Sequence, residues 1–226
     1  MRPEPHQDFN KNVFINCPFD SEYDPLLQPI LFTILYFGLT PQIASQTVDS
    51  GEQRITKILS LILKSKFSIH DLSRIRSAKR GELYRLNMPF ELGIDYGCRC
   101  TARGHLKRKK FLVLGEKPHD YKKALSDLAG IDAAWHMNKP YKVVLALRNW
   151  FIESVPMNKT ADSATVIWYN FIEFNKTFYG RRKSEGFSNE DLKMMPISEY
   201  ISYIRTWISN NKAIGKKFPP AKPQRP

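Results

Sequence analysis

Glu91 has the residue type and the local setting for chemistry at a sugar carbon. It follows Asn87 and Pro89, an N-cap candidate and a proline suited to a first turn, so the sequence places it in the first turn of a helix. Unpaired backbone N–H groups and the helix dipole favour an ionised carboxylate there. Such a fixed anionic oxygen can attack or stabilise the oxocarbenium-like carbon that forms when an N-glycosidic bond breaks. The competing interpretation is plain stabilisation of the helix N-terminus.

Asp71 is the second candidate acid, because it leaves an expected strand toward the same crevice. It is placed to orient the Glu91 carboxylate, to bind a ribose hydroxyl or to move a proton. We therefore predict Glu91 and Asp71 as the catalytic residues. A structural role for Asp71, as the cap of a turn or helix, is the alternative.

Further polar and aromatic residues follow the expected strands, at the edge of a parallel sheet where ligands bind. Ser50 and Arg54 suit a phosphate at a helix N-terminus, although an ordinary capped helix also explains them. Phe19 suits stacking on a base, although aromatic side chains more often belong to a core. The residues predicted to contact a nucleotide are Asn16, Phe19, Asp20, Ser50, Arg54, His70 and Asn87.

The cysteine and glycine patterns argue against several other kinds of site. Cys98, Cys100 and His105 fall short of the four ligands of a structural zinc site, so no metal is predicted. Cys17 has no histidine nearby in the sequence to activate it as a nucleophile. The glycines form neither a Walker A nor a GxGxxG pattern, so no P-loop site, no Rossmann dinucleotide site and no cofactor is predicted.

These residues need elements to hold them, and short apolar runs alternate with helical periodicities along the chain. Pro41 demotes the second expected strand to a strand start or a sheet edge. Ser50 and Gln53 have the spacing of a capping box, and Gly97 suits the end of a helix. Strands are expected at 13–18, 39–44, 66–72, 110–115 and 134–137, helices at 24–37, 50–63, 87–97 and 141–151, and a long loop at 73–85.

This alternation predicts an α/β fold with a doubly wound, flavodoxin-like parallel sheet of about five strands. Helical spacing at 162–179 and 197–210, with a charged link between them, predicts a C-terminal helical extension. The expected divisions are 1–11 as a flexible N-terminus, 12–155 as the α/β domain, 156–211 as the helical extension and 212–226 as a basic disordered tail.

The chain has 226 residues and a formal charge of +13, from 35 Lys+Arg against 22 Asp+Glu. Residues 101–125 hold eight basic residues and two acidic ones, and residues 211–226 hold five basic residues and no acidic one. Most of the excess charge therefore lies in one loop region and the tail. A hydrophobic content of 42% is that of a globular protein, which excludes a wholly disordered chain.

The sequence also indicates the cellular compartment of the protein. Its longest apolar run, residues 29–38, is half of the ~20 residues that a membrane-spanning helix needs. The first residues are polar and do not resemble a signal peptide. Three cysteines make a poor disulfide framework. We therefore expect a cytoplasmic protein without membrane contact.

Four segments, 13–20, 49–54, 67–74 and 87–93, resemble in order a family of bacterial proteins described as nucleotide-binding or TIR-like. That family is related in fold to the nucleoside 2-deoxyribosyltransferases, and the resemblance covers residues 10–155. It implies that Glu91 is the catalytic carboxylate and that Asp71 helps to bind the sugar. It also implies that NAD or another nucleotide is a substrate rather than a cofactor.

The resemblance implies a biological setting as well, since relatives of this kind often act as effectors of bacterial anti-phage defence. It therefore predicts an N-glycosidase that hydrolyses NAD, working as a homo-oligomer or with a partner protein of a defence system. Two alternatives stay open. One is a nucleotide-sensing or signalling module without catalysis. The other is a nucleic-acid-binding accessory protein that uses the basic loop and tail, for which an ordinary solvated loop and tail is the competing interpretation.

Overall fold

A sheet of five parallel strands forms the centre of the fold, in the order β2-β1-β3-β4-β5. The order 2-1-3-4-5 is that of flavodoxin-like, doubly wound sheets, which confirms the predicted fold class. The computed structural model describes residues 7–46, 51–75, 86–128, 130–155 and 161–211. The strands are β1 (Asn12–Asn16), β2 (Thr40–Gln42), β3 (Phe67–Asp71), β4 (Lys110–Gly115) and β5 (Ala133–Trp135).

The strands form where β-branched and aromatic residues run together. Every position of β1 and β3 is buried, as expected for central strands of a parallel sheet with both faces covered. β4 has the bounds that the sequence predicted. Pro41 lies in β2, which is an edge strand, so its missing N–H removes no bond to a second neighbour.

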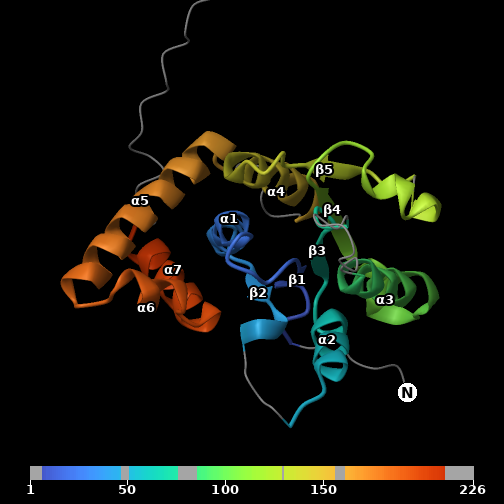
Figure 1. Cartoon of the computed structure of the whole chain (residues 1–226). Helices are drawn as coiled ribbons and strands as arrows, with labels where there is room; N and C mark the ends of the chain where they lie inside the picture. Colours follow the sequence, from blue (N-terminus) through green and yellow to red (C-terminus); the bar gives the residue numbers. More distant parts are fainter. Residues whose placement is uncertain (1–6, 47–50, 76–85, 129, 156–160, 212–226) are drawn as a thin grey trace, which may run out of the picture.

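Helices cover both faces of the sheet, and the four that do so are α1 (Asp24–Tyr36), α2 (Arg54–Leu63), α3 (Asn87–Thr101) and α4 (Pro140–Ser154). α1 and α4 lie on one face, and α2 and α3 on the other (Figure 1). Successive strand residues point to opposite faces. Val13 and Ile15 accordingly pack in one cluster with α1 and α4, whereas Phe14 packs with α2.

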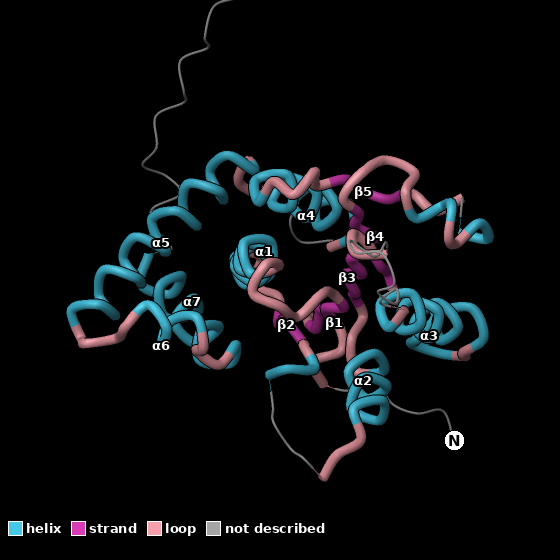
Figure 2. The backbone as a smooth tube through the Cα atoms, viewed as in Figure 1, coloured by secondary structure: helices cyan, strands magenta, loops and turns pink. Residues whose placement is uncertain are grey.

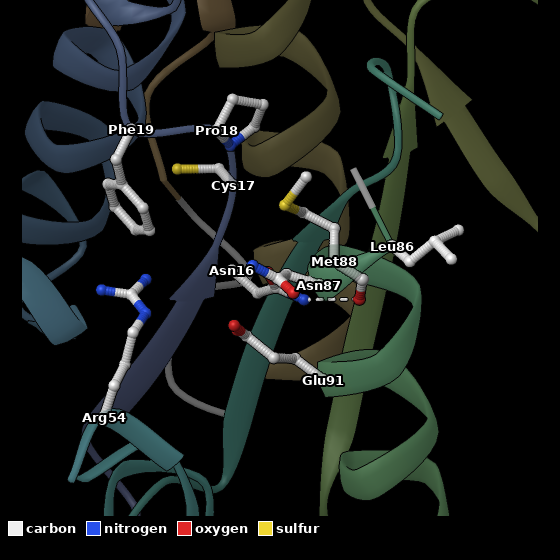
Figure 3. Close-up of a pocket in the computed structure, with 9 residues that line it drawn as sticks. All are labelled: Asn16, Cys17, Pro18, Phe19, Arg54, Leu86, Asn87, Met88 and Glu91. Atoms are coloured by element: carbon white, nitrogen blue, oxygen red, sulfur yellow. Dashed lines mark hydrogen bonds between the residues drawn. The ribbon is translucent and has the colours of Figure 1, made fainter. Parts of the chain in front are cut away.

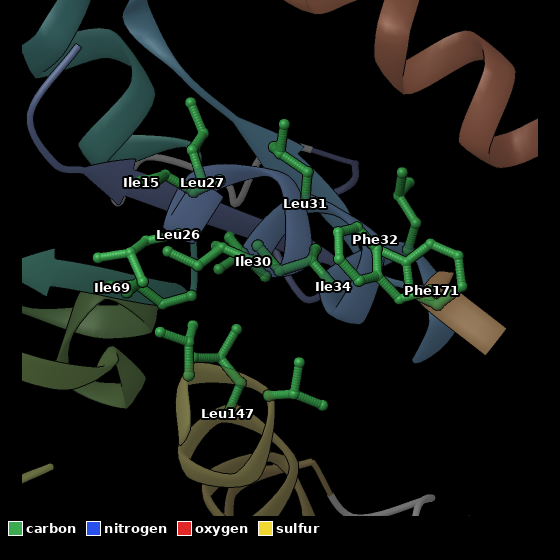
Figure 4. Close-up of a cluster of buried hydrophobic side chains, with 14 of the residues drawn as sticks. Ile15, Leu26, Leu27, Ile30, Leu31, Phe32, Ile34, Ile69, Leu147 and Phe171 are labelled. Atoms are coloured by element: carbon green, nitrogen blue, oxygen red, sulfur yellow. The ribbon is translucent and has the colours of Figure 1, made fainter. Parts of the chain in front are cut away.

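α1 is buried on nearly all sides, which explains its broad apolar surface. Its residues from Leu26 to Leu35 are buried apart from Gln28. One side contacts the sheet through Ile30 and its neighbours, close to Ile15 of β1 (Figure 4). The far side contacts the C-terminal helices, where Phe32 meets the ring of Phe171 at 5.6 Å. A helix that is apolar all round belongs inside a protein.

The C-terminal extension consists of helices that complete the burial of α1 (Figure 2). Ser163 caps the first of them by accepting a hydrogen bond from the Val166 N–H at 3.3 Å. The expected charged link is shorter than predicted, because the first helix continues and a capping box between Ser188 and Asp191 starts a short second one. These helices are α5 (Ala164–Ser184), α6 (Asn189–Lys193) and α7 (Ile197–Asn211).

The C-terminal end of α3 and the N-terminal end of α2 differ from the prediction. α3 continues past Gly97 to Thr101, because its C-terminal half still packs against the sheet through Asp95 and Cys98. α2 begins at Arg54 after an extended Gln53, with no side-chain cap, so the expected capping box is wrong. Short 3-10 turns connect other elements, and they are η1 (Ala44–Gln46), η2 (Gly104–Arg108), η3 (Tyr121–Lys123) and η4 (Ser126–Leu128).

Several sequence predictions fall on residues that the structure does not describe. The N-terminus up to residue 6, most of the expected loop at 73–85 and the basic tail from residue 212 lie outside the described residues. Within the described residues, no helix has the length and apolarity to cross a bilayer.

We predict that the C-terminal helices and the sheet domain unfold together, because they share the core around α1. Phe32 is fully buried and contacts the rings of Phe171, Phe174 and Trp207. Phe32→Ala should therefore lower the free energy of unfolding by about 3–5 kcal/mol in urea titrations followed by tryptophan fluorescence. Phe90→Ala, at a ring that is 59% exposed, should change it by less than about 0.5 kcal/mol. Two separate unfolding transitions would contradict the shared core.

Candidate functional site

A cavity of about 400 Å³ opens at the carboxyl ends of the central strands (Figure 3). The chain passes from β1 to β2 on one side and then to β3 on the other, so the strand order reverses there. Ligands of doubly wound sheets bind in the crevice at this switch point. The described residues that line the cavity are Asn16, Cys17, Pro18, Phe19, Arg54, Leu86, Asn87, Met88 and Glu91.

Glu91 projects from α3 into this cavity, but it lies in the second turn of the helix rather than in the first turn that the sequence predicted (Figure 3). α3 begins at Asn87, and its first turn contains no acidic residue. The Glu91 side chain is only 6% exposed and has no hydrogen bond or ion pair within the described residues. Burial therefore raises the pKa of Glu91 to about 7, and the charge of Arg54 opposes this only in part.

This result corrects the expected electrostatics of Glu91. A helix N-terminus would favour the ionised carboxylate, whereas desolvation favours the protonated one. A carboxyl with a pKa of about 7 is divided between both forms at neutral pH. It can therefore accept a proton, donate one, or supply an anionic oxygen to a cationic carbon.

Arg54 and Phe19 form the opposite wall of the cavity. Arg54 is the first residue of α2, and its guanidinium points into the space that Glu91 faces from α3 (Figure 3). The guanidinium carbon lies 5.8 Å from the centre of the Phe19 ring. Phe19 is partly exposed, and Arg54 is exposed. This wall offers a positive charge for phosphate and a flat ring for stacking.

Asn16 ties the end of β1 to the first turn of α3. Its amide nitrogen donates to the carbonyl oxygen of Met88 at 2.8 Å and lies 3.0 Å from Nδ1 of His70. Because an amide nitrogen can only donate, His70 Nδ1 accepts in this contact and Nε2 carries the ring proton. Nε2 in turn contacts Oδ2 of Asp95 at 3.0 Å. His70 is thus fully buried behind the cavity and does not line it.

Asp95 lies one helical turn after Glu91 and joins a buried ion pair. Lys109 Nζ is 3.1 Å from Asp95 Oδ1, and both side chains are fully buried. Lys109 also donates to the carbonyl oxygen of Ile62 at the end of α2, at 2.7 Å. Burial alone would raise the pKa of Asp95, but His70 and Lys109 hold it below its usual value. The network therefore fixes α3, and with it Glu91, against α2, β3 and the start of β4.

Asp71 occupies the other face of the sheet and does not join Glu91 in the cavity. Its Oδ2 accepts a hydrogen bond from the Tyr23 hydroxyl, and its Oδ1 accepts one from the Ser73 N–H at 2.7 Å. His136 Nε2 lies 3.3 Å from Oδ2, a long and poorly aligned contact. Burial alone would raise the pKa of Asp71, but these three groups lower it.

The alternation of side chains along a strand explains why Asp71 lies on the other face of the sheet from Glu91. His70 and Asp71 are neighbours in β3, so His70 points toward α3 while Asp71 points toward α1. The sequence predicted the end of the strand at which Asp71 lies, but it was wrong in placing Asp71 in the same crevice as Glu91. Its contacts to the start of α1 and the end of β5 give Asp71 a structural role.

The remaining predicted contacts divide between the cavity and its surroundings. Asn87 lines the cavity and makes no capping hydrogen bond, although it stands at the start of α3. Asp20 does not line the cavity, and its Oδ2 pairs with Arg74 at 2.6 Å. Ser50 lies outside the described residues.

Cys17 lies in the cavity wall, but its thiol is poorly suited to act as a nucleophile. Burial raises the pKa of Cys17 well above its ordinary value, and the carboxylates of Asp71 and Glu91 raise it further. The sulfur therefore stays protonated at neutral pH. Among the described residues, no group of three or more His, Cys, Asp or Glu side chains is arranged to hold a metal ion.

Four buried partners of the site were missed by the sequence analysis. Asp95 could have been found, since it follows Glu91 by one helical turn and shares its face. His136 could also have been found, because it follows β5 at the same edge of the sheet. Nothing in the sequence marks Tyr23 as the partner of Asp71, or Lys109 as a buried lysine within a run of exposed cations.

We predict strong coupling between Asp95 and Lys109. Asp95→Asn and Lys109→Met should each lower the free energy of unfolding by about 3–5 kcal/mol, because each leaves a buried charge without its partner. The double variant should lose less free energy of unfolding than the sum of the losses in the two single variants. Urea unfolding of all four proteins measures the coupling. Additive losses would show that the pair does not act as a unit.

Comparison with known proteins supplies no relative for this chain. A scan against protein-family models finds no match, and searches of curated proteins and of solved structures find none either. The geometry and charge of the residues themselves are therefore the basis for a function.

Proposed function

We propose that this protein cleaves the N-glycosidic bond of a nucleotide, with NAD as the substrate and Glu91 as the catalytic carboxylate. One observation carries the proposal: a buried carboxyl with a pKa of about 7 faces a cavity at the switch point of the sheet. A perturbed acid in such a position is typical of catalytic sites. The resemblance of four segments to a TIR-like family, related in fold to the nucleoside 2-deoxyribosyltransferases, supports the same chemistry.

The presence of one carboxyl in the described cavity wall favours a cationic leaving group. When the bond between ribose C1′ and the nicotinamide nitrogen breaks, the electron pair returns to a positively charged ring and leaves it neutral. No acid has to protonate that group. A purine or pyrimidine base of a nucleoside leaves less readily without protonation, and Asp71 is committed to Tyr23, Ser73 and His136.

The reaction then needs little more than a placed anion and a water. As the C1′–N bond breaks, ionised Glu91 stabilises the positive charge at C1′ or bonds to that carbon. Water then adds its oxygen to C1′, and its proton passes to Glu91 or to solvent. The products are nicotinamide, ADP-ribose and one proton.

The other cavity residues provide binding groups for the same substrate. Arg54 supplies a positive charge for the pyrophosphate, and Phe19 supplies a face for stacking on a ring. Asn87 offers a side-chain amide to a ribose hydroxyl. Tyr23, Asp71 and His136 hold the neighbouring loops in place from behind. None of these roles requires a metal or a cofactor.

A cellular role follows from the resemblance alone. We propose that the protein is a cytoplasmic effector of bacterial anti-phage defence, in which consumption of NAD stops growth. A defence-system partner, or assembly of several copies, would then control its activity.

A nucleotide-sensing module is the second candidate, and the separation of Asp71 from Glu91 favours it. With a single acid in the described wall of the cavity, the same residues can hold a nucleotide without cleaving it. Such a module would gain thermal stability with NAD while leaving the NAD intact.

We predict that Glu91→Gln lowers NAD hydrolysis at least about 10³-fold, because the amide cannot stabilise a cation at C1′ as an anion does. Chromatography of NAD and its products measures the rate. Wild-type activity should rise as the pH passes through about 7, where Glu91 ionises. Asn87→Ala, a matched change in the same wall, should mainly raise KM. Full activity of Glu91→Gln would exclude Glu91 as the catalytic carboxylate.

We also predict that Glu91→Gln stabilises the protein at high pH. The folded protein keeps the Glu91 proton up to a pH of about 7, whereas an unfolded chain loses it near 4.5. Wild-type stability therefore falls as the pH rises between these values. At pH 8 the variant should be more stable by about 2–4 kcal/mol, and at pH 4 nearly equal to the wild type. Urea unfolding at both values tests this, and equal stability at pH 8 would contradict the burial of Glu91.

A further inference from the structure

The edge of the sheet opposite the cavity, where the parallel strands begin, gathers basic side chains from three segments. One segment precedes β1, one joins α2 to β3, and one joins α3 to β4. We call this surface the basic edge. Its residues are Lys11, Lys64, Lys66, Arg103, Lys107, Arg108 and Lys110.

Backbone contacts show that the three segments adjoin one another. The Lys66 N–H donates to the carbonyl oxygen of Phe9 at 3.0 Å, and the Lys110 N–H donates to the carbonyl oxygen of Lys66 at 2.9 Å. The rings of Phe9 and His105 lie 4.8 Å apart. Residues from before β1, before β3 and before β4 therefore share one continuous edge. The sequence showed only the cations of the third segment as a cluster.

The cations of the basic edge face solvent and are not neutralised by ion pairs. All are exposed except Lys66, which is half-buried, and none forms an ion pair within the described part of the chain. The acidic residues beside them are Asp8, before β1, and Glu153, which neighbours Ser154 at the end of α4. The carbonyl oxygen of Ser154 lies 3.5 Å from Lys110 Nζ. Lys109, in the same segment, is buried and paired with Asp95.

The cations of the basic edge lie close enough together to destabilise one another's charged forms. Burial lowers the pKa of Lys66, and the nearby charges of Arg108 and Lys110 lower it further. The negative end of the α2 dipole explains why a cation is favourable at Lys64, which is the C-cap of that helix. It does not account for Lys107 and Arg108, which lie in a 3-10 turn beyond α3. An unneutralised cluster of this kind gains stability when a polyanion is present.

We propose that the basic edge binds the phosphate backbone of a nucleic acid. The cations spread along an exposed edge rather than lining a pocket, which suits a chain of phosphates better than one small anion. An anionic membrane is the less favoured partner, because stable membrane binding needs apolar anchors. Leu63 lies beside Lys64, whereas the other exposed aliphatic residues of α2, Leu59 and Ile55, lie one and two turns away from this edge. The cavity lies at the other end of the strands, so nucleic acid and nucleotide can bind together.

The proposal predicts binding that depends on charge and not on sequence. With about four phosphate contacts, the logarithm of the affinity should fall with the logarithm of salt concentration with a slope of about −3 to −4. The probe is a fluorescein-labelled DNA duplex of mixed sequence, about 25 base pairs long, with the full-length protein and salt from about 50 to 200 mM. Fluorescence anisotropy measures the affinity.

The test variant combines Lys107→Glu, Arg108→Glu and Lys110→Glu, all at exposed positions. It should bind the duplex at least about tenfold more weakly, with a salt slope reduced by about 2–3. The matched control combines Lys176→Glu, Lys183→Glu and Lys193→Glu, which make the same change in net charge on α5 and α6. The control should bind almost as the wild type does. Circular dichroism and urea unfolding check that both variants fold.

Three results would overturn the proposal. One is equal binding by the test variant and the control, which would show that net charge alone matters. Another is loss of binding on deletion of residues 212–226 while the test variant still binds, which would assign the nucleic acid to the tail. The third is binding of the wild type to anionic phospholipid vesicles but not to the duplex. Hydrolysis of NAD is measured separately and does not enter this test.

Discussion

The buried pair of Asp95 and Lys109 is the interaction on which the site depends. Two charges removed from water are costly unless each finds its partner, so the pair tolerates little movement of the elements that carry it. Lys109 reaches the end of α2, and Asp95 reaches His70 of β3. α3 is thus held at its middle by charge and at its start by Asn16. Glu91 lies between these two attachments, so its position in the cavity is set by the buried pair behind it and by Asn16 in the cavity wall.

Strand alternation divides the polar groups behind the site into two networks. The network of His70 and Asp95 faces α3, whereas the network of Asp71, Tyr23 and His136 faces α1. Both lie at the carboxyl ends of strands, where the sequence led us to expect a single crevice. Because neighbouring strand residues point in opposite directions, only one carboxyl reaches the described cavity wall. This is why the proposed reaction uses one acid and a leaving group that needs no proton.

The sequence was sufficient for the fold and for part of the site. The alternation of apolar runs with helical spacing predicted the parallel sheet, and Pro41 correctly marked an edge strand. Asn87 and Glu91 were placed at the cavity because residues after strands meet at one edge. The face that Asp71 takes was not predictable, because β3 is buried on both sides and has no solvent-exposed face to set its register. The pKa of Glu91 was expected to be low, because a local motif reveals a helix terminus but not the depth of burial around it.

Two acidic residues of α3 have different surroundings, and this difference bears directly on function. Glu91 and Asp95 lie one turn apart on the same helix, and both are buried. Asp95 has His70 and Lys109 as partners, and its pKa is low. Glu91 has no such partner within the described residues, and its pKa is about 7. The helix therefore gives one buried carboxylate an ion pair and a histidine contact, and leaves the other facing the cavity without a charged partner among the described residues. A stable fold gains nothing from that arrangement, whereas a site that must place a reactive oxygen beside a cationic carbon requires it.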